Sequence, residues 1–337
     1  MNQWLVEGEE RHTGKPLTIV YSGHQSGFVF VRGLAFGDEY REQYLGKVWI
    51  FNRKKILTPR PEEALYFVET REILAKKDSR RRQFYVPMWI DGELETDKAI
   101  ERSTKVGNIK EDLRRIRKNK LEYEVTGDDE RISDFHRDMY VPYIRNTFGP
   151  AALFHSLESL KKSEGTIELL VIRRDGEAVA GQILVYEQNR VRTREIGVKN
   201  GDRQYVKAGV MGALYYYGLL HLQSRGFKTV GLGGSRAWLN DGVLRFKKKW
   251  GMRLGKPWPS GFLLVAPKRS EGAAAFLANN PFLSITDGRL EGIVFSDSSE
   301  KISARDVKKL HRDYFYEGMS KLLIYPLRSC LLFTSPS

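Results

Sequence analysis

The sequence GLGGSRAWLNDGVLRFKKKWG, residues 231–251, contains three consecutive lysines between a phenylalanine and a tryptophan. At about 100° per residue, Val243, Phe246 and Trp250 fall at i, i+3 and i+7 on one stripe of a helix. The spacing therefore predicts a short amphipathic helix that packs on the rest of the protein through this stripe.

The lysines of this helix differ in where they point. Lys247 and Lys249 flank the apolar stripe on opposite sides, whereas Lys248 points roughly away from it. Asn240 and Asp241 stand where a residue caps the N-terminus of the helix. Two interpretations are open: all three lysines are solvated, or one flanking lysine packs its stem on the core and presents its ammonium to an anion.

The residues before this helix carry clear strand and helix signals. Residues 166–198 predict three antiparallel strands joined by tight turns at 175–176 and 188–189. Residues 208–226 are apolar nearly all round, which is typical of a buried helix. A short strand is expected at 227–233, directly before the lysine helix.

The two ends of the chain give weaker patterns. The first part predicts, in order, a β-hairpin system over 16–58, a helix over 60–84, an irregular or hairpin-like segment over 85–97, a basic surface helix over 108–126 and an amphipathic helix over 128–149. Pro142 is expected to kink or close the last of these helices. The final part predicts strands around 261–267 and 291–296 and a closing helix over 304–327.

Composition limits the kind of partner. The 337 residues include 56 Lys plus Arg against 42 Asp plus Glu, a net charge of +14, and 41% of them are apolar. A chain of this length is expected to form two compact domains, and its positive field attracts polyanions or phosphorylated ligands. The basic residues concentrate in two zones, 71–120 and 242–270, which either line one cleft or cover separate faces.

Several classes of protein are excluded by what the sequence lacks. No segment approaches the roughly 18 apolar residues of a membrane span, and the first residues lack a secretory pattern, so we expect a cytoplasmic protein. The lone Cys330 excludes an intrachain disulfide and a cysteine-based metal cluster. The histidines, among them His136, His155 and His221, show no spacing with carboxylates that indicates a metal. We therefore expect no bound metal and no permanently bound cofactor.

The order of strand meander, buried helix, short strand and lysine helix resembles the acyltransferases of the GNAT superfamily, specifically the Fem-type (FemAB-like) aminoacyltransferases, which couple two such folds. The resemblance covers roughly residues 100–260. Its most specific element is residues 231–251, with their Asp-Gly, Phe-Lys and Trp-Gly pairs. It implies an α/β (α+β mixed sheet) protein with tandem GNAT-like folds: a smaller or degenerate copy at 1–100, a helical connection at 101–150 and the catalytic copy at 151–337.

The resemblance also implies site residues. In Fem-type enzymes a Phe-Lys pair at this place faces the reacting centre, which implies catalytic roles for Phe246 and Lys247. Positive charge at Lys247 then serves the oxyanion of acyl transfer or a phosphate of the acceptor. Glu195, at the end of the third meander strand, stands where some members place a general base; an exposed strand carboxylate is the alternative.

The loop before the buried helix bears on the acyl donor. CoA-using members carry Gln or Arg, two residues, Gly, one residue and Gly or Ala there, because backbone N–H groups bind a pyrophosphate. Here Gln204 is followed at the third place by Lys207, and Gly209 and Gly212 lie off the required spacing. These four residues are the candidate donor-binding set, and the co-substrate is either acyl-CoA or aminoacyl-tRNA. The basic zones suit either anionic donor.

Residues just before the lysine helix are candidates for substrate binding. The guanidinium of Arg236 suits a phosphate or carboxylate, with Asn240 and Asp241 nearby; a surface arginine and two helix caps are the plainer interpretations. The GLGGS motif at 231–235 lacks the third glycine of a dinucleotide fingerprint, so that kind of nucleotide site is not expected.

The predicted function is transfer of an acyl or aminoacyl group from an activated anionic donor to an amine-bearing acceptor. Direct attack is expected, because the sequence offers no credible enzyme nucleophile. The alternative is a basic RNA-binding protein that keeps the GNAT fold without catalysis.

Overall fold

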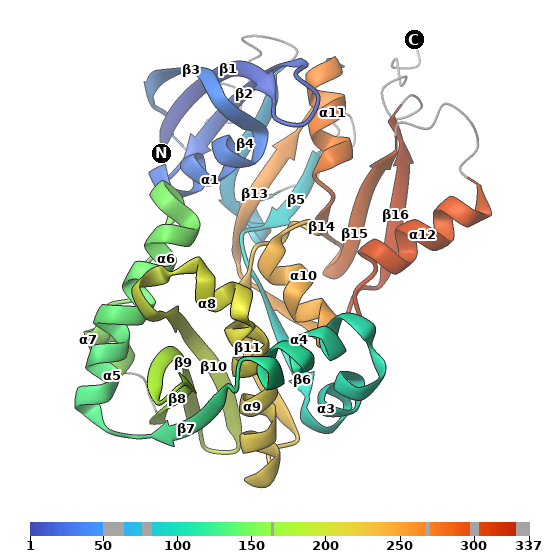
Figure 1. The fold of residues 1–337 in the computed structure, drawn as a ribbon. Helices are drawn as coiled ribbons and strands as arrows, with labels where there is room; N and C mark the ends of the chain where they lie inside the picture. Colours follow the sequence, from blue (N-terminus) through green and yellow to red (C-terminus); the bar gives the residue numbers. More distant parts are fainter. Residues whose placement is uncertain (50–63, 76–82, 163–164, 267–269, 297–302, 328–337) are drawn as a thin grey trace, which may run out of the picture. The chain divides into compact units, whose positions relative to one another are not determined.

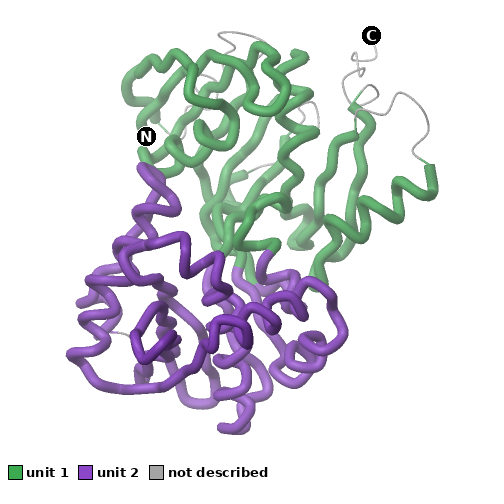
Figure 2. Tube along the Cα trace, in the orientation of Figure 1, with its two compact units in different colours: residues 1–90, 235–245, 256–337 green, residues 91–234, 246–255 purple. Residues whose placement is uncertain are grey.

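The computed structural model describes all residues except 50–63, 76–82, 163–164, 267–269, 297–302 and 328–337, so Cys330 lies outside the described residues. The chain forms two compact units: unit 1 comprises 1–90, 235–245 and 256–337, and unit 2 comprises 91–234 and 246–255 (Figure 2). Both contain helices and a sheet with parallel and antiparallel strands, which confirms the mixed α/β class. The predicted division into 1–100, 101–150 and 151–337 stays a prediction.

Unit 1 is built on a six-stranded sheet in the order β3-β1-β2-β4-β13-β5 (Figure 1). Its strands are β1 (Asn2–Glu10), β2 (Pro16–Gly23), β3 (Phe36–Lys47), β4 (Leu65–Arg71), β5 (Gln83–Pro87) and β13 (Ser260–Val265). β1 pairs antiparallel with β2 and β3, whereas β2 and β4 run parallel up to the pair Ser22 and Val68. The strand direction therefore switches between β2 and β4.

The rest of unit 1 consists of helices and a small sheet. Its further elements are α1 (Gln25–Ala35), α11 (Glu271–Asn279), α12 (Ala304–Tyr314), β14 (Phe282–Thr286), β15 (Arg289–Ser296) and β16 (Lys321–Pro326). The last three form a sheet in which β15 pairs antiparallel with β14 and parallel with β16. The closing helix expected over 304–327 is thus correct up to Tyr314, after which the chain returns as a strand.

Two predictions for unit 1 are wrong. Residues 27–36, assigned to the hairpin system, lie almost entirely in helix α1, which buries Phe28 and Val31 on one side. Residues 60–84, assigned to a helix, contain strand β4, where every residue of the segment 65–69 is buried. A strand covered on both faces has no alternation, so a short apolar run of this kind looks like a buried helix in the sequence.

Unit 2 is built on a seven-stranded sheet in the order β12-β6-β11-β10-β9-β8-β7. Its strands are β6 (Ile90–Glu95), β7 (Glu122–Thr126), β8 (Thr166–Arg174), β9 (Glu177–Glu187), β10 (Arg190–Val198), β11 (Thr229–Ser235) and β12 (Arg253–Pro257). β8, β9 and β10 form the predicted antiparallel meander, and both of its turns contain a residue with positive φ, Asp175 and Gln188. β10 and β11 are parallel.

The helices of unit 2 agree with the predictions in part. They are α3 (Thr96–Lys105), α4 (Gly107–Lys118), α5 (Asp129–Phe135), α6 (Val141–Phe148), α7 (Leu157–Lys161), α8 (Arg203–Ala208) and the buried helix α9 (Val210–Ser224). The helix expected over 108–126 ends at Lys118 and is followed by strand β7, and α3 was not predicted. Between α5 and α6 the chain makes a π-helical turn, His136–Tyr140, and Pro142 follows it in the first turn of α6. The lysine helix α10 (Gly242–Lys249) runs from unit 1 into unit 2.

The two faces of the unit 2 sheet carry different helices. Ile183 and Val185 of β9 belong to an apolar cluster with residues of α5 and the π-helical turn. Gln182 and Leu184, which alternate with them, lie beside residues of α9 instead. Both faces are covered, so the central meander strand β9 is buried from Val179 to Tyr186.

Gly197 on β10 has backbone against it where a side chain would stand. A Cβ there would lie 2.5 Å from the nitrogen of Tyr140 and 2.6 Å from the carbonyl carbon of Met139. We expect Gly197→Ala to lower the free energy of unfolding by about 2 kcal/mol, because the π-helical turn must shift. Gly218→Ala in α9 is the control, since its Cβ would meet only ordinary contacts from 3.8 Å. Urea denaturation that finds the two variants equally stable contradicts this packing.

Two segments of the chain serve both sheets. Residues 83–95 give β5 to unit 1 and β6 to unit 2, and residues 253–265 give β12 to unit 2 and β13 to unit 1. β13 lies between β4 and β5, and β6 lies between β11 and β12. This exchange separates the first and last parts of unit 1 in the sequence, whereas unit 2 is interrupted by residues 235–245, which belong to unit 1.

Candidate active site

The parallel strands β10 and β11 separate partway along their length. Their pairing ends at Thr193 opposite Leu232, although β10 continues to Val198 and β11 to Ser235. The separation lies toward the carboxyl ends of both strands, where the antiparallel meander changes to a parallel pair. Open α/β sheets bind ligands at switch points of this kind.

β10 also bulges at this point. Arg194 and Glu195 together stand opposite the single residue Ile183 of β9. A bulge locally changes the direction in which side chains leave the strand. The Glu195 side chain therefore projects from β10 two residues beyond the last pair with β11.

Lys247 reaches the same point from helix α10. It is buried, with 6% of its surface exposed, and its Nζ donates to the carbonyl oxygens of Gly233 and Gly234. These are the first two residues of β11 beyond its last pair with β10. The ammonium thus lies where the two strands separate, and it does not point to bulk solvent.

The buried face of α10 differs from the predicted stripe. Leu244, Lys247 and Trp250 are buried, whereas Val243 is 39% exposed. Phe246 is half-buried and meets the ring of Tyr215 edge-on, with 5.0 Å between ring centroids. The prediction at Val243 is wrong because the helix packs with a lysine inside its buried face, where an apolar pattern cannot anticipate it.

Glu195 is paired with a histidine on a distant segment. Its Oε1 lies 3.1 Å from Nδ1 of His155 and 3.2 Å from Nη2 of Arg194. The carboxylate is fully buried, whereas the His155 side chain is 58% exposed. Among the residues that the structure describes, Oε2 of Glu195 has no hydrogen-bond partner.

Competing effects set the pKa of Glu195. Burial raises it, but the hydrogen bond from His155 and the charge of Arg194 outweigh burial and leave the pKa below its usual value. Glu195 is therefore a carboxylate at neutral pH, suited to hold an imidazole in one orientation and to stabilise it when it takes a proton.

His155 was not recognised as a site residue in the sequence. Its backbone N–H donates to the hydroxyl of Tyr140, at 3.0 Å, and its carbonyl oxygen lies 2.9 Å from Nε2 of His136. The π-helical turn thus fixes the segment that carries His155. Forty residues separate His155 from Glu195, and no local spacing in the sequence indicates the contact.

The predicted donor-binding residues lie on α8 and at the start of α9. Gln204 and Lys207 are exposed on α8, and the amide of Gln204 donates to Asp202 at 2.6 Å. Gly209 joins α8 to α9 with a φ of 101°, and Gly212 lies in the first turn of α9. Their donor-binding roles stay a prediction.

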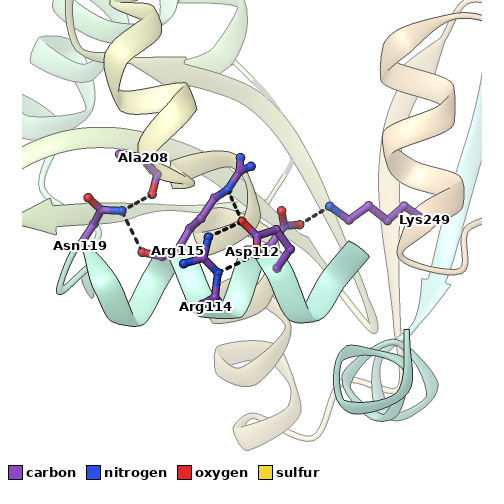
Figure 3. Close-up of polar contacts among 7 residues, drawn as sticks. Asp112, Arg114, Arg115, Asn119, Ala208 and Lys249 are labelled. Carbon is purple, nitrogen blue, oxygen red and sulfur yellow. Dashed lines mark hydrogen bonds and ion pairs between the residues drawn. The ribbon is translucent and has the colours of Figure 1, made fainter. Parts of the chain in front are cut away.

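Helix α4 packs closely against that first turn (Figure 3). A Cβ at Gly209 would lie 2.8 Å from Cβ of Arg115, and a Cβ at Gly212 would lie 2.7 Å from Cβ of Asp112. The Asp112 carboxylate pairs with Nζ of Lys249, and both side chains are mostly buried. A carboxylate beside the first turn of a helix is favoured by the helix dipole. The Asp112 carboxylate therefore lies directly beside the first turn of α9.

The three predicted substrate-binding residues belong to unit 1. Asp241 caps α10, since its Oδ1 accepts from the N–H of Leu244 at 2.8 Å. The amide of Asn240 donates to the carbonyl oxygen of Asn279 at 2.9 Å. Arg236 is buried between two aromatic rings. Their roles in substrate binding stay predictions.

A small void lies inside unit 2, between the sheet and α9. Its volume is about 10 Å³, and its lining includes Thr193, Leu232, Tyr215 and Gly218. That volume holds about one water molecule, so the void itself is not an acyl pocket.

Two further features concern ligands and membranes. Within the described residues, no group of three or more His, Cys, Asp or Glu is placed to hold a metal ion. No helix in the described part of the chain is long and apolar enough to cross a membrane.

Comparison with known proteins finds a similar family over part of the chain. Residues 103–248 match the family model described as an acetyltransferase (GNAT) domain. No curated protein matches the chain.

Similar solved structures include FemX, which is 12% identical, with 77% of this chain and 83% of that chain covered and a TM-score of 0.39. L-PGS from Bacillus licheniformis is 14% identical, with 79% and 85% covered and a TM-score of 0.38. A GCN5-related N-acetyltransferase from Kribbella flavida is 14% identical, with 74% and 98% covered and a TM-score of 0.31. These likenesses are too low to indicate an activity.

The matched residues 103–248 contain the meander, the separating strands β10 and β11 and the Phe246–Lys247 pair, within the span of roughly 100–260 over which the sequence resembles the GNAT superfamily. The match confirms that this part of the chain resembles the GNAT superfamily.

Proposed function

We propose that unit 2 transfers an aminoacyl group from aminoacyl-tRNA to an amine by direct attack. One observation carries the proposal: a buried ammonium and a histidine–carboxylate pair are attached to the two strands at the point where these separate. Lys247 binds the β11 carbonyls beyond the last pair, and Glu195 leaves β10 two residues beyond it. Both kinds of group are needed to transfer an acyl group to an amine.

His155 is the proposed general base. Its Nδ1 faces Glu195, so Nε2 of the exposed ring takes a proton from the acceptor amine, and the buried carboxylate stabilises the resulting imidazolium. The amine nitrogen gives up this proton as its lone pair forms the bond to the acyl carbon, and the carbonyl oxygen becomes an oxyanion. When the C–O bond to the donor breaks, the imidazolium returns a proton to the leaving oxygen.

Lys247 is the proposed electrostatic partner of the oxyanion. Its ammonium is held by two backbone carbonyls and does not need to reorient when charge develops. Preorganised charge in a site shielded from water is worth more than the same charge in solution. Phe246 packs beside Tyr215 and is proposed to fix the helical turn that carries Lys247.

Packing around α9 supports aminoacyl-tRNA over acyl-CoA as the donor. A pyrophosphate at the first turn of α9 would meet the Asp112 carboxylate and the covering helix α4. The ester of a charged tRNA carries no pyrophosphate, and its phosphates lie along the nucleic acid. Arg117, Lys118 and Lys120 are exposed around the end of α4 and suit contacts with such phosphates. Lys207 and Gln204 of α8 are proposed as further donor contacts.

Thermal unfolding with two donors tests the proposal. A non-hydrolysable aminoacyl-tRNA analogue at 100 times its Kd is expected to add about 2.7 kcal/mol of stability, and acetyl-CoA is expected to add none. Uncharged tRNA should stabilise less than the charged analogue, because it lacks the acyl group. Stabilisation by acetyl-CoA overturns the choice of donor. Equal effects of charged and uncharged tRNA, without any transfer, favour the RNA-binding alternative.

A further inference from the structure

A buried arginine in unit 1 has a donor with no partner. Arg236 is 7% exposed, and among the described residues its Nη1 makes no hydrogen bond. The guanidinium lies over two rings, 4.1 Å from the centroid of Phe30 and 4.0 Å from that of Trp89. Stacking on aromatic rings leaves the N–H donors at the guanidinium edge to bind an oxyanion.

The carboxylates that face this arginine are bound by other donors. Glu69 accepts from the hydroxyl of Tyr21 and pairs with Nδ1 of His24. Asp241 accepts from the backbone N–H of Leu244. Neither carboxylate accepts from Nη1 of Arg236, although both interact with the guanidinium through space. Burial lowers the pKa of Arg236 to about 10, so it is still charged at neutral pH.

The missing acceptor for Nη1 of Arg236, among the described residues, is unfavourable for folding. Leaving a buried charged donor without an acceptor costs more than the roughly 1–3 kcal/mol of a neutral group. The Arg32 guanidinium provides the contrast within the same unit. It also lies near two rings, those of Phe28 and Tyr40, but its Nη1 is paired with Glu42 at 2.6 Å. Among the described residues, one stacked arginine is therefore paired with a carboxylate, whereas Nη1 of the other has no acceptor.

The arginine lies near a topological switch in unit 1. β2 and β4 are parallel up to Ser22 opposite Val68, and Glu69 is the next residue of β4. Helix α1, which carries Phe30, begins directly after β2 at Gln25. The parallel pair β2 and β4 thus repeats the topology of β10 and β11, and ligands bind at such carboxyl ends.

Partly exposed aromatic rings stand beside the guanidinium. Trp89 and Phe30 are half-buried, Trp258 is 43% exposed, and the Trp89 and Trp258 ring centroids are 6.1 Å apart. Because Nη1 is buried, a ligand reaches it only after neighbouring side chains move. A planar group on that ligand can then stack on the partly exposed Trp89 ring.

We propose that unit 1 contains a second binding site, in which Arg236 binds the phosphate or carboxylate of a ligand whose adjoining planar group stacks on Trp89. The site uses residues of unit 1 alone and does not depend on the transfer chemistry proposed for unit 2. Its ligand class is an aryl or heterocyclic oxyanion. A nucleic acid, which is bound through many phosphates, is not the expected ligand, because the site offers a single buried arginine.

Titration with three small probes tests the site. Phenyl phosphate and benzoate carry the two candidate oxyanions on the same ring, and benzyl alcohol carries no charge. At least one of the two anions is expected to bind and to change the tryptophan fluorescence, and benzyl alcohol is not. Which anion binds more tightly distinguishes a phosphate site from a carboxylate site. Absence of binding by both anions at about 10 mM, well above the roughly 1 mM that corresponds to −4.1 kcal/mol, overturns the proposal.

Matched variants assign the binding to Arg236. Arg236→Gln is expected to weaken binding of the anion at least tenfold, whereas Arg32→Gln, which removes the paired arginine, leaves binding unchanged. Trp89→Leu keeps the charge and is expected to abolish the fluorescence change while calorimetry still detects weaker binding. Circular dichroism checks that each variant is folded. Unchanged affinity in folded Arg236→Gln overturns the site, and no result of this titration depends on acyl transfer.

Discussion

Lys247→Met is expected to lower the rate constant of the proposed aminoacyl transfer by about 10²–10³-fold, with little change in donor affinity. This loss is the size measured when one preorganised oxyanion donor is removed from an enzyme. The methionine keeps the length and the packing of the buried stem but has no ammonium. Single-turnover transfer with excess enzyme measures the effect separately from binding.

Two controls separate charge from folding. Lys248 lies on the same helix but has no role in the proposed mechanism. The Lys248→Met variant is therefore expected to transfer at the wild-type rate. Lys247→Met also leaves the carbonyls of Gly233 and Gly234 without this donor, which costs about 1–3 kcal/mol of stability. Alkylation of a Lys247→Cys variant with 2-bromoethylamine restores an ammonium and should recover most of the rate. Wild-type protein treated in the same way controls for Cys330.

The RNA-binding alternative predicts a different result for these lysine variants. A binding protein without catalysis would lose affinity for tRNA in small steps when any of Lys247, Lys248 or Lys249 is replaced. Each lost phosphate contact would lower the salt slope of binding by about one. Transfer at the wild-type rate in Lys247→Met removes this lysine from the mechanism.

Glu195→Gln is expected to lower the transfer rate by about 10²–10⁴-fold at neutral pH. The amide oxygen can still accept from Nδ1 of His155, so the ring keeps its place, but the charge that stabilises the imidazolium is gone. Arg194→Gln is the control for the same ion cluster, since it removes a neighbour of Glu195 without touching the proposed base. A wild-type rate in Glu195→Gln contradicts the role of this pair.

The same variant changes how stability depends on pH. The pKa of Glu195 is lowered in the folded protein, so its carboxylate stabilises the fold above the unfolded pKa of about 4.3. That contribution is lost as the pH falls through the lower folded value. The stability of the wild type relative to Glu195→Gln is therefore expected to decrease below about pH 4. Thermal melts of both proteins from neutral to acid pH measure the difference, and parallel curves contradict it.

Local pattern was a good guide for several segments that have one buried face or are buried all round over a full helix. The meander over 166–198, the buried helix α9 and the lysine helix α10 were predicted for this reason. The same reasoning misassigned residues 60–84, because a short strand that is buried on both faces carries no period. It also misassigned residues 27–36, which form helix α1 with one buried side. It also misplaced the buried face of α10, since a lysine bonded to backbone carbonyls counts as polar in any pattern.

The candidate site was predictable in part. Glu195 and Lys247 were identified through the family resemblance, but their surroundings depend on contacts between distant segments. His155 lies on an irregular segment and meets Glu195 only in the folded protein. The covering of α9 by Asp112 likewise depends on two glycines that allow helices to touch, and glycine spacing alone does not indicate its partner.

The exchange of β6 and β13 affects how the protein is made. During synthesis the first ninety residues leave the ribosome long before residues 260–265, which form the strand between β4 and β5. Translation adds about 5–20 residues per second, so β13 is synthesised on the order of ten seconds or more after β4 and β5. Until then the edges of β4 and β5 that pair with β13 are unpaired. The nascent N-terminal half thus exposes two apolar strand edges, which makes it a natural client for chaperones until the last third of the chain has emerged.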